Sequence, residues 1–177
     1  MAMRMLDAGG VPIFTDGRRR ADAHNPSGYF EADEVKTLAT GTDTAWLKRA
    51  RGKAIKIVSP LLTHLPESYD YQVVFMRRDL DEVIASQNAL LDARREPRAT
   101  NDAPMRAHYE QHLRQIDRFL ERRSCFSVLN VAYADVLAHP REQSARMAAF
   151  LGGGLDVTRM VAVADPALYR QRRAGRD

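Results

Sequence analysis

The segment from residue 71 to residue 95 constrains the fold more than any other part of the chain of 177 residues. Tyr71 to Met76 reads YQVVFM, a short and almost continuously apolar run that is typical of a strand buried on both faces. Asp79 and Glu82 follow at the Asp-x-x-Glu spacing that starts helices, and apolar residues at helical spacing continue to about Arg95. A buried strand that leads directly into a helix is typical of a parallel sheet covered by helices.

The same alternation of strands and helices extends over the rest of the chain. Short apolar runs predict further strands at 11–14, 54–58 and 126–133. Helical patterns and end signals predict helices at 3–8, 31–38, 43–51, 105–123 and 140–152. No linker-like or repeated segment divides the sequence, so we expect an α/β fold with a mainly parallel sheet in a single domain, residues 1–177.

Composition excludes several classes of protein. Hydrophobic residues make up 45% and charged residues 28%, as in a packed globular domain, and no run of 18 apolar residues predicts a membrane span. Cys125 is the single cysteine, which cannot form an internal disulfide and favours a cytoplasmic location. A net charge of +4 does not demand nucleic acid, and the arginines are not interleaved with aromatic residues, so no nucleic-acid partner is expected.

Arg78 and Ser86 are the first candidate site residues. Arg78 lies at the exit of the predicted strand, and Ser86 lies eight positions later on the predicted helix. Ligands of parallel sheets bind at the carboxyl ends of strands, where a guanidinium and a hydroxyl two helical turns away could hold one phosphate. The same spacing also fits a solvent-exposed arginine and a small serine used for helix packing.

The arginine, seven intervening residues and serine at a strand-to-helix junction resemble the site where sulfotransferases hold the 3′-phosphate of their donor, 3′-phosphoadenylyl sulfate. AIKIVSPLLTHLP resembles the family's strand and loop with the catalytic lysine, and VLNVAYADVLAHPREQSARMAAFLG resembles its later strand, Tyr-x-Asp motif and helix. TDGRRRADAHNPSGYFE and DPALYRQRR are similar to segments of a bacterial subgroup. These segments cover most of the chain in the expected order, and they imply a fold of the P-loop NTPase type.

The resemblance also implies roles for individual residues. Lys56 would be the catalytic lysine that stabilises charge on the departing bridging oxygen. The alternative is a lysine at the edge of the sheet with no catalytic role. Arg78 and Ser86 would bind the 3′-phosphate. Tyr133 would contact adenine, unless it is a core aromatic at a strand end, and Arg170 would reach the nucleotide. No metal is implied, because fixed cations and N–H groups can neutralise the transferring group.

Two departures from the family pattern are visible. The Gly-rich loop that would wrap the 5′-phosphosulfate is not found, and MAMRMLDAGG is expected to start inside the helix that follows such a loop. We therefore expect an N-terminally truncated domain, poor or no sulfuryl transfer, and self-association through open sheet edges. Val58 stands where cytosolic members carry the histidine base, which leaves His64 and Glu31 as candidate bases.

Two functions follow from these observations. The first is transfer of a sulfuryl group to a hydroxyl or amine of a small-molecule or glycan acceptor. The second is a non-catalytic nucleotide-binding or interaction module derived from the same fold. The sequence contains no pattern that identifies the acceptor.

Overall fold

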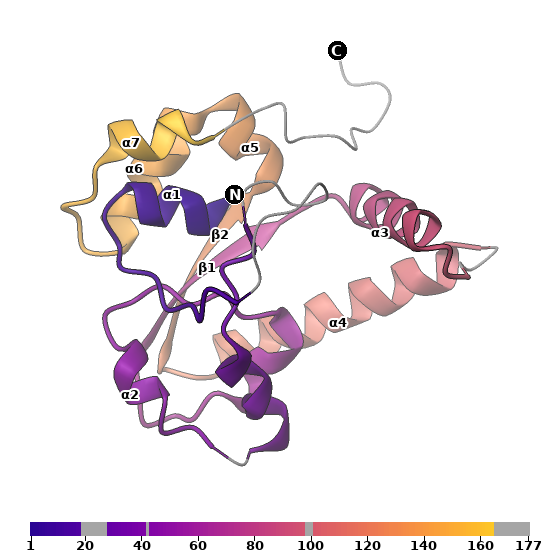
Figure 1. Ribbon diagram of the computed structural model, residues 1–177, viewed down its shortest axis with the longest axis horizontal. Helices are drawn as coiled ribbons and strands as arrows, with labels where there is room; N and C mark the ends of the chain where they lie inside the picture. Colours follow the sequence, from indigo (N-terminus) through magenta and orange to yellow (C-terminus); the bar gives the residue numbers. More distant parts are fainter. Residues whose placement is uncertain (19–27, 42, 98–100, 165–177) are drawn as a thin grey trace.

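The computed structural model describes residues 1–18, 28–41, 43–97 and 101–164 (Figure 1). In chain order, its elements are α1 (Ala2–Ala8), η1 (Asp33–Thr40), α2 (Leu47–Ala50), η2 (Ser59–His64), β1 (Tyr71–Arg77), α3 (Leu80–Arg94), α4 (Ala103–Glu121), β2 (Phe126–Ala132), α5 (Tyr133–Ala138), α6 (Pro140–Phe150) and α7 (Val157–Ala162). The elements η1 and η2 are 3-10 helices. None of the described helices is both long and apolar enough to span a bilayer.

Strands β1 and β2 form a parallel pair, and α3 and α4 lie between them in the sequence. The register runs without interruption from Tyr71 opposite Phe126 to Arg77 opposite Ala132. Parallel neighbours require a crossover connection, which the two helices supply here. The α/β fold with a parallel sheet flanked by helices is thereby confirmed, and the described part of the sheet consists of these two strands.

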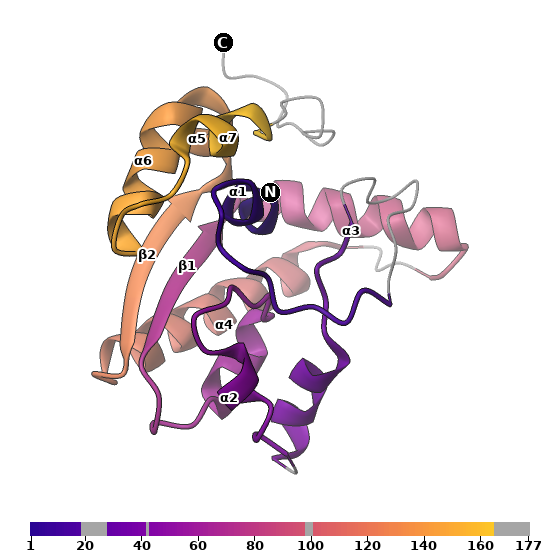
Figure 2. The same ribbon diagram turned by 60° about the vertical axis from the view of Figure 1, so that its left-hand side comes forward.

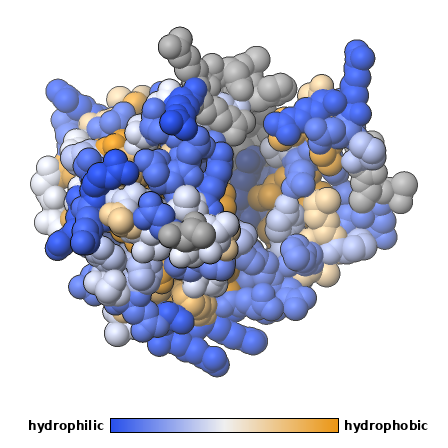
Figure 3. All heavy atoms as spheres, turned by 60° about the horizontal axis from the view of Figure 1, so that its bottom comes forward, coloured by the Kyte–Doolittle hydropathy of each residue, from blue (hydrophilic) through white to orange (hydrophobic). Residues whose placement is uncertain are grey.

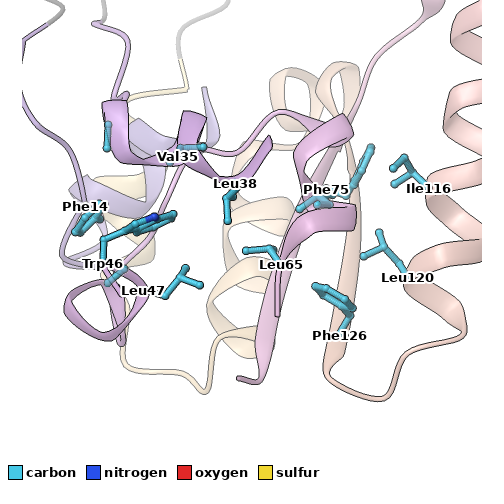
Figure 4. Close-up of a cluster of buried hydrophobic side chains, with 13 residues drawn as sticks. Phe14, Val35, Leu38, Trp46, Leu47, Leu65, Phe75, Ile116, Leu120 and Phe126 are labelled. Atoms are coloured by element: carbon cyan, nitrogen blue, oxygen red, sulfur yellow. The ribbon is translucent and has the colours of Figure 1, made fainter. Parts of the chain in front are cut away.

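Helix α4 covers one face of the strand pair. Val73 and Phe75 of β1 pack with Phe126 of β2 against Ile116 and Leu120 of the helix (Figure 4). The same cluster continues into the segment that precedes β1, where the rings of Phe14 and Trp46 are stacked 5.4 Å apart. This face therefore holds the larger hydrophobic core, which ties the first third of the chain to the sheet.

The alternate residues of both strands point to the opposite face, as the two-residue period of a strand requires. Val74 and Val131 belong to a second cluster with Met5 of α1, Met147 of α6 and Met160 of α7. Figures 1 and 2 show these helices, together with α5, on the side of the strands that faces away from α4. Both strands are thus covered on both faces, which explains their nearly continuous apolar sequence.

Several local predictions differ from the structure. The predicted strands at 11–14 and 54–58 pair with each other only through an isolated parallel bridge between Ile13 and Ala54, so neither forms a strand of the sheet. The predicted helix at 43–51 is the single turn Leu47–Ala50, and the one at 31–38 is the 3-10 helix Asp33–Thr40. Tyr133 begins α5 rather than ending β2.

Candidate functional site

Arg78 and Tyr133 meet at the carboxyl end of the strand pair. Each residue directly follows the last registered pair, Arg77 and Ala132, on its own strand. The guanidinium carbon of Arg78 lies 4.9 Å from the centroid of the Tyr133 ring, within the range of a cation–π contact. Since the carboxyl ends of parallel strands are where such folds bind ligands, this contact marks the first part of a candidate site.

Glu82 forms an ion pair with the Arg78 side chain. The Nε of Arg78 donates a hydrogen bond of 3.2 Å to Oε2 of Glu82, one turn along α3, and the Glu82 side chain is only 7% exposed. Asp79 is the N-cap of this helix, and its carboxylate accepts a hydrogen bond of 2.8 Å from the backbone N–H of Asp81. The cap fixes where α3 begins, and the buried carboxylate then fixes the orientation of the guanidinium.

Ser86 lies on α3 one further turn beyond Glu82. Residues four apart share a helix face, so Glu82 and Ser86 lie on one face of α3, and Arg78, which precedes the helix, reaches this face through its contact with Glu82. Ser86 is half-buried, and the structure shows no hydrogen bond of its hydroxyl with another described residue. Ser86 therefore shares a helix face with Glu82, the buried carboxylate that Arg78 contacts and that the sequence assigned only to the start of the helix.

Lys56 forms a second group with residues from the segment before η1. Its ammonium donates a hydrogen bond of 3.0 Å to Oε1 of Glu31 and one of 3.1 Å to the backbone carbonyl of Tyr29. The same nitrogen lies 5.8 Å from the centroid of the Tyr29 ring. Glu31, which the sequence suggested as a base, is thus in direct contact with the lysine although 25 positions separate them.

The start of α1 connects Lys56 with the strand ends. Burial, and then the positive charges of Arg4 and Lys56, lower the pKa of the Met1 amino group from its ordinary value of 8.0. Met1 also packs against the cluster that contains Met76 and Val131, the residues near the carboxyl ends of β1 and β2. Met1 is therefore close enough to Lys56 to feel its charge, and it also contacts the apolar cluster near the carboxyl ends of the strands.

Arg77, unlike its neighbour Arg78, binds residues of β2 and α4 and so stabilises the fold. Its Nε donates a hydrogen bond of 2.8 Å to Asn130 Oδ1 on β2, and its Nη2 pairs with Asp117 on α4. Its guanidinium carbon lies 4.1 Å from the centroid of the Phe75 ring. These contacts join both strands to α4 immediately before the chain reaches Arg78, a role that the sequence reasoning missed because all partners except Phe75 are distant in the chain.

The remaining candidates have different positions. Arg170 lies outside the described residues, so its predicted contact with a nucleotide stays a prediction. His64 is exposed at the end of η2, and His112 on α4 forms a hydrogen bond of 2.8 Å with Ser59 Oγ, which fastens η2 to that helix. Within the described ranges, no group of three or more His, Cys, Asp or Glu side chains could hold a metal ion.

The surface has a hollow next to α3, the helix that carries Glu82 and Ser86 (Figure 3). Figure 3 turns the molecule about the horizontal axis of Figure 1, and a hollow opens between the arm formed by α3 with the first part of α4 and the rest of the molecule. The hydroxyl of Tyr109 on α4 donates a hydrogen bond of 2.5 Å to Gln87 on α3 and so holds the arm together. Both hydrophilic and hydrophobic residues border the hollow.

Comparison with known proteins identifies the family. Residues 23–156, well over half of the chain, match the model of the sulfotransferase family. No curated protein and no solved structure gave a match. The matched range contains Glu31, Lys56, Arg78, Ser86 and Tyr133. The chain therefore belongs to the sulfotransferase family.

Proposed function

We propose that the chain binds 3′-phosphoadenylyl sulfate at the carboxyl end of β1 and β2 and transfers its sulfuryl group to an acceptor hydroxyl or amine. The observation that carries this proposal is the Arg78 guanidinium lying over the Tyr133 ring beyond the last registered pair of strand residues. Membership of the sulfotransferase family supports it.

In this proposal the arginine group binds the nucleotide half of the donor. Arg78 supplies a planar, permanently charged fork suited to phosphate oxygens, and Ser86 adds a hydroxyl from the helix that follows, one turn beyond Glu82. Tyr133 offers an aromatic face at the same strand edge, against which an adenine ring would stack. Glu82 orients the Arg78 guanidinium by accepting a hydrogen bond from Nε, but it also places a negative charge close to the phosphate.

In this proposal the lysine group takes part in the chemical step. The acceptor oxygen or nitrogen forms a bond to sulfur while the bond from sulfur to the bridging phosphate oxygen breaks, and adenosine 3′,5′-bisphosphate leaves. Lys56 would stabilise the negative charge that develops on the bridging oxygen. Glu31, 3.0 Å from the Lys56 ammonium, would accept the proton that the acceptor loses. The transfer thus needs no metal or redox partner.

The direct test is a sulfuryl-transfer assay with 3′-phosphoadenylyl sulfate and a panel of hydroxyl and amine acceptors. Lys56→Ala should lower kcat by about 10²–10³, the usual effect of removing one group that stabilises developing charge. Glu31→Gln should lower kcat while leaving donor binding intact. Lys53→Ala is the matched control, because Lys53 is exposed in the same segment and its ammonium lies 5.9 Å from the centroid of the Phe14 ring. Equal loss in Lys53→Ala would refute the assignment of Lys56.

One observation favours the second candidate function, a non-catalytic nucleotide-binding module. The ammonium of Lys56 lies 3.0 Å from the Glu31 carboxylate, which offsets the positive charge that the chemical step would need. A chain that binds adenosine 3′,5′-bisphosphate but transfers no sulfuryl group to any acceptor of the panel would have this function. We also propose a cytoplasmic location, which the single cysteine Cys125 supports.

A further inference from the structure

A second charged region lies at the opposite end of the sheet from Arg78 and Tyr133. It is an open depression of about 660 Å³ where the end of α4 turns into β2, and the residues that line it include Arg118, Phe119, Arg122 and Arg123. The seven residues of β2 separate it from the strand exit, a distance of roughly 20 Å at about 3.3 Å per residue. The depression is therefore separate from the proposed donor site.

Arg123, one of the three arginines that line the depression, already has partners within the protein. Arg123 pairs with Glu67, and its guanidinium carbon lies 4.5 Å from the centroid of the Phe119 ring. These contacts hold its side chain in place and largely compensate its charge. Arg123 and Phe119 thus form a fixed surface that is partly apolar.

The other two arginines have no such compensation. Arg118 and Arg122 are exposed, and the structure shows no ion pair or side-chain hydrogen bond of either with another described residue. Arg122, which caps the end of α4, follows Arg118 by four residues, about 6 Å along the helix axis, and like charges at this spacing repel. Arg114, one turn earlier, differs because it lies 3.9 Å from Glu110. An anion placed between Arg118 and Arg122 would relieve their repulsion.

We propose that this depression binds a small organic phosphate, a molecule that joins a phosphate group to an apolar body. Arg118 and Arg122 would bind the phosphate through charge-assisted hydrogen bonds. Phe119, whose ring carries the Arg123 guanidinium, would contact the apolar body, and Gln115 and Ser124 add neutral hydrogen-bonding groups to the lining. The volume lies within the range of about 300–1,000 Å³ that is usual for small-molecule sites.

The experiment is calorimetric titration with 2-naphthyl phosphate at low ionic strength. All proteins carry Arg78→Ala, so that the proposed donor site does not contribute and its failure leaves this test unaffected. Arg118→Gln with Arg122→Gln should weaken binding about tenfold or more. The control with the same charge loss is Arg114→Gln with Arg141→Gln, which removes exposed arginines that do not line the depression and should bind as the parent does.

Two further ligands separate the contributions to binding. 2-Naphthol lacks the phosphate and inorganic phosphate lacks the apolar body, so each should bind more weakly than 2-naphthyl phosphate. Thermal melting of each variant verifies that the fold is retained. Equal binding by the Arg118/Arg122 double variant and its parent would overturn the proposal, as would an equal loss in the control pair. Inorganic phosphate binding as tightly as 2-naphthyl phosphate would show that the depression does not recognise an organic phosphate.

Discussion

Arg78 and Tyr133 occupy equivalent positions just beyond two parallel strands, each one residue after the last registered pair, and the guanidinium carbon of Arg78 lies 4.9 Å from the centroid of the Tyr133 ring. Their contact depends on the register: a shift of one strand by a single residue would turn one of the side chains to the other face of the sheet. The two residues therefore form one unit, built by the pairing of β1 with β2.

The first prediction concerns nucleotide binding at this unit. Arg78→Ala should weaken the binding of adenosine 3′,5′-bisphosphate by about tenfold or more, because a charge-assisted hydrogen bond contributes on the order of 1.5–3 kcal/mol. Tyr133→Ala should also weaken it, whereas Tyr133→Phe keeps the aromatic face and should bind nearly as well as the wild type. Isothermal titration calorimetry measures all three variants.

Arg114→Ala is the control for these variants, since it removes an exposed arginine of α4 that pairs with Glu110. Unchanged affinity in Arg78→Ala would mean that the nucleotide does not bind at the carboxyl end of β1.

The second prediction concerns the buried carboxylate beside Arg78. Glu82→Gln removes a negative charge near the proposed phosphate position, while the amide oxygen can still accept the hydrogen bond from Arg78 Nε. The affinity for adenosine 3′,5′-bisphosphate should rise several-fold, and this rise should shrink with added salt. Calorimetry at two salt concentrations measures the change. A lower affinity in Glu82→Gln would show that the charge of Glu82 is needed to orient the guanidinium.

The third prediction concerns Arg77 and the stability of the framework. Arg77→Ala removes the contacts with Asn130, Asp117 and the Phe75 ring, and should lower the free energy of unfolding by about 1–3 kcal/mol. Arg77→Lys keeps the charge opposite Asp117 but loses the planar contacts, so its stability should lie between that of the wild type and that of Arg77→Ala. Urea denaturation measures the free energy of unfolding of both variants. Arg114→Ala, which removes a single weak surface pair, is the control. A loss in Arg77→Ala no larger than that of Arg114→Ala would contradict the role of Arg77 in joining the strands to α4.

The fourth prediction concerns the packing of α1 on α7. A Cβ atom at Gly9 would lie 2.8 Å from Cγ of Met160 and 3.2 Å from the backbone oxygen of Met5. Gly9→Ala should therefore destabilise the fold by about 1–3 kcal/mol, as overpacking usually does. Met160→Ala in the same chain removes the first clash, so the two substitutions should cost less together than the sum of their separate effects. Denaturant unfolding of the three variants measures this coupling, and strict additivity would place the two residues out of contact.

The fifth prediction concerns stability at high pH. Burial, and to a smaller extent Cys125 and Tyr69, raise the pKa of Tyr71 from 10.0 to about 12, and its hydroxyl donates a hydrogen bond of 2.9 Å to the Pro66 carbonyl. The unfolded chain loses the phenol proton at lower pH than the folded chain, so this group lowers the stability as the pH rises from about 10 to about 12.

Tyr71→Phe should lower the stability at neutral pH, where the hydrogen bond is lost, and should make the decline above about pH 10 shallower. Unfolding free energies of the wild type and the variant at several pH values measure both effects. Parallel pH profiles would mean that Tyr71 titrates alike in the folded and unfolded chains.

The sequence alone determined the elements whose signals are local. The apolar run of β1, the capping residue Asp79, the apolar stripe of α4 and Pro140 at the start of α6 are patterns within a few residues, and the structure confirms each of these elements. The Arg78–Ser86 spacing and the order of the motif-bearing segments along the chain also pointed to the sulfotransferase family, which the family match confirms.

Only the tertiary structure decided which side chains meet. Lys56 and Glu31 are 25 positions apart, and Arg77 and Asn130 are 53 apart, so no local spacing reveals either pair. The segment around Lys56 has the composition of a strand but forms only one bridge, because a strand needs a partner in register as well as apolar residues. Periodicity within the chain specifies which face of an element is apolar, whereas contacts between elements depend on register and packing, which arise only when the whole chain folds.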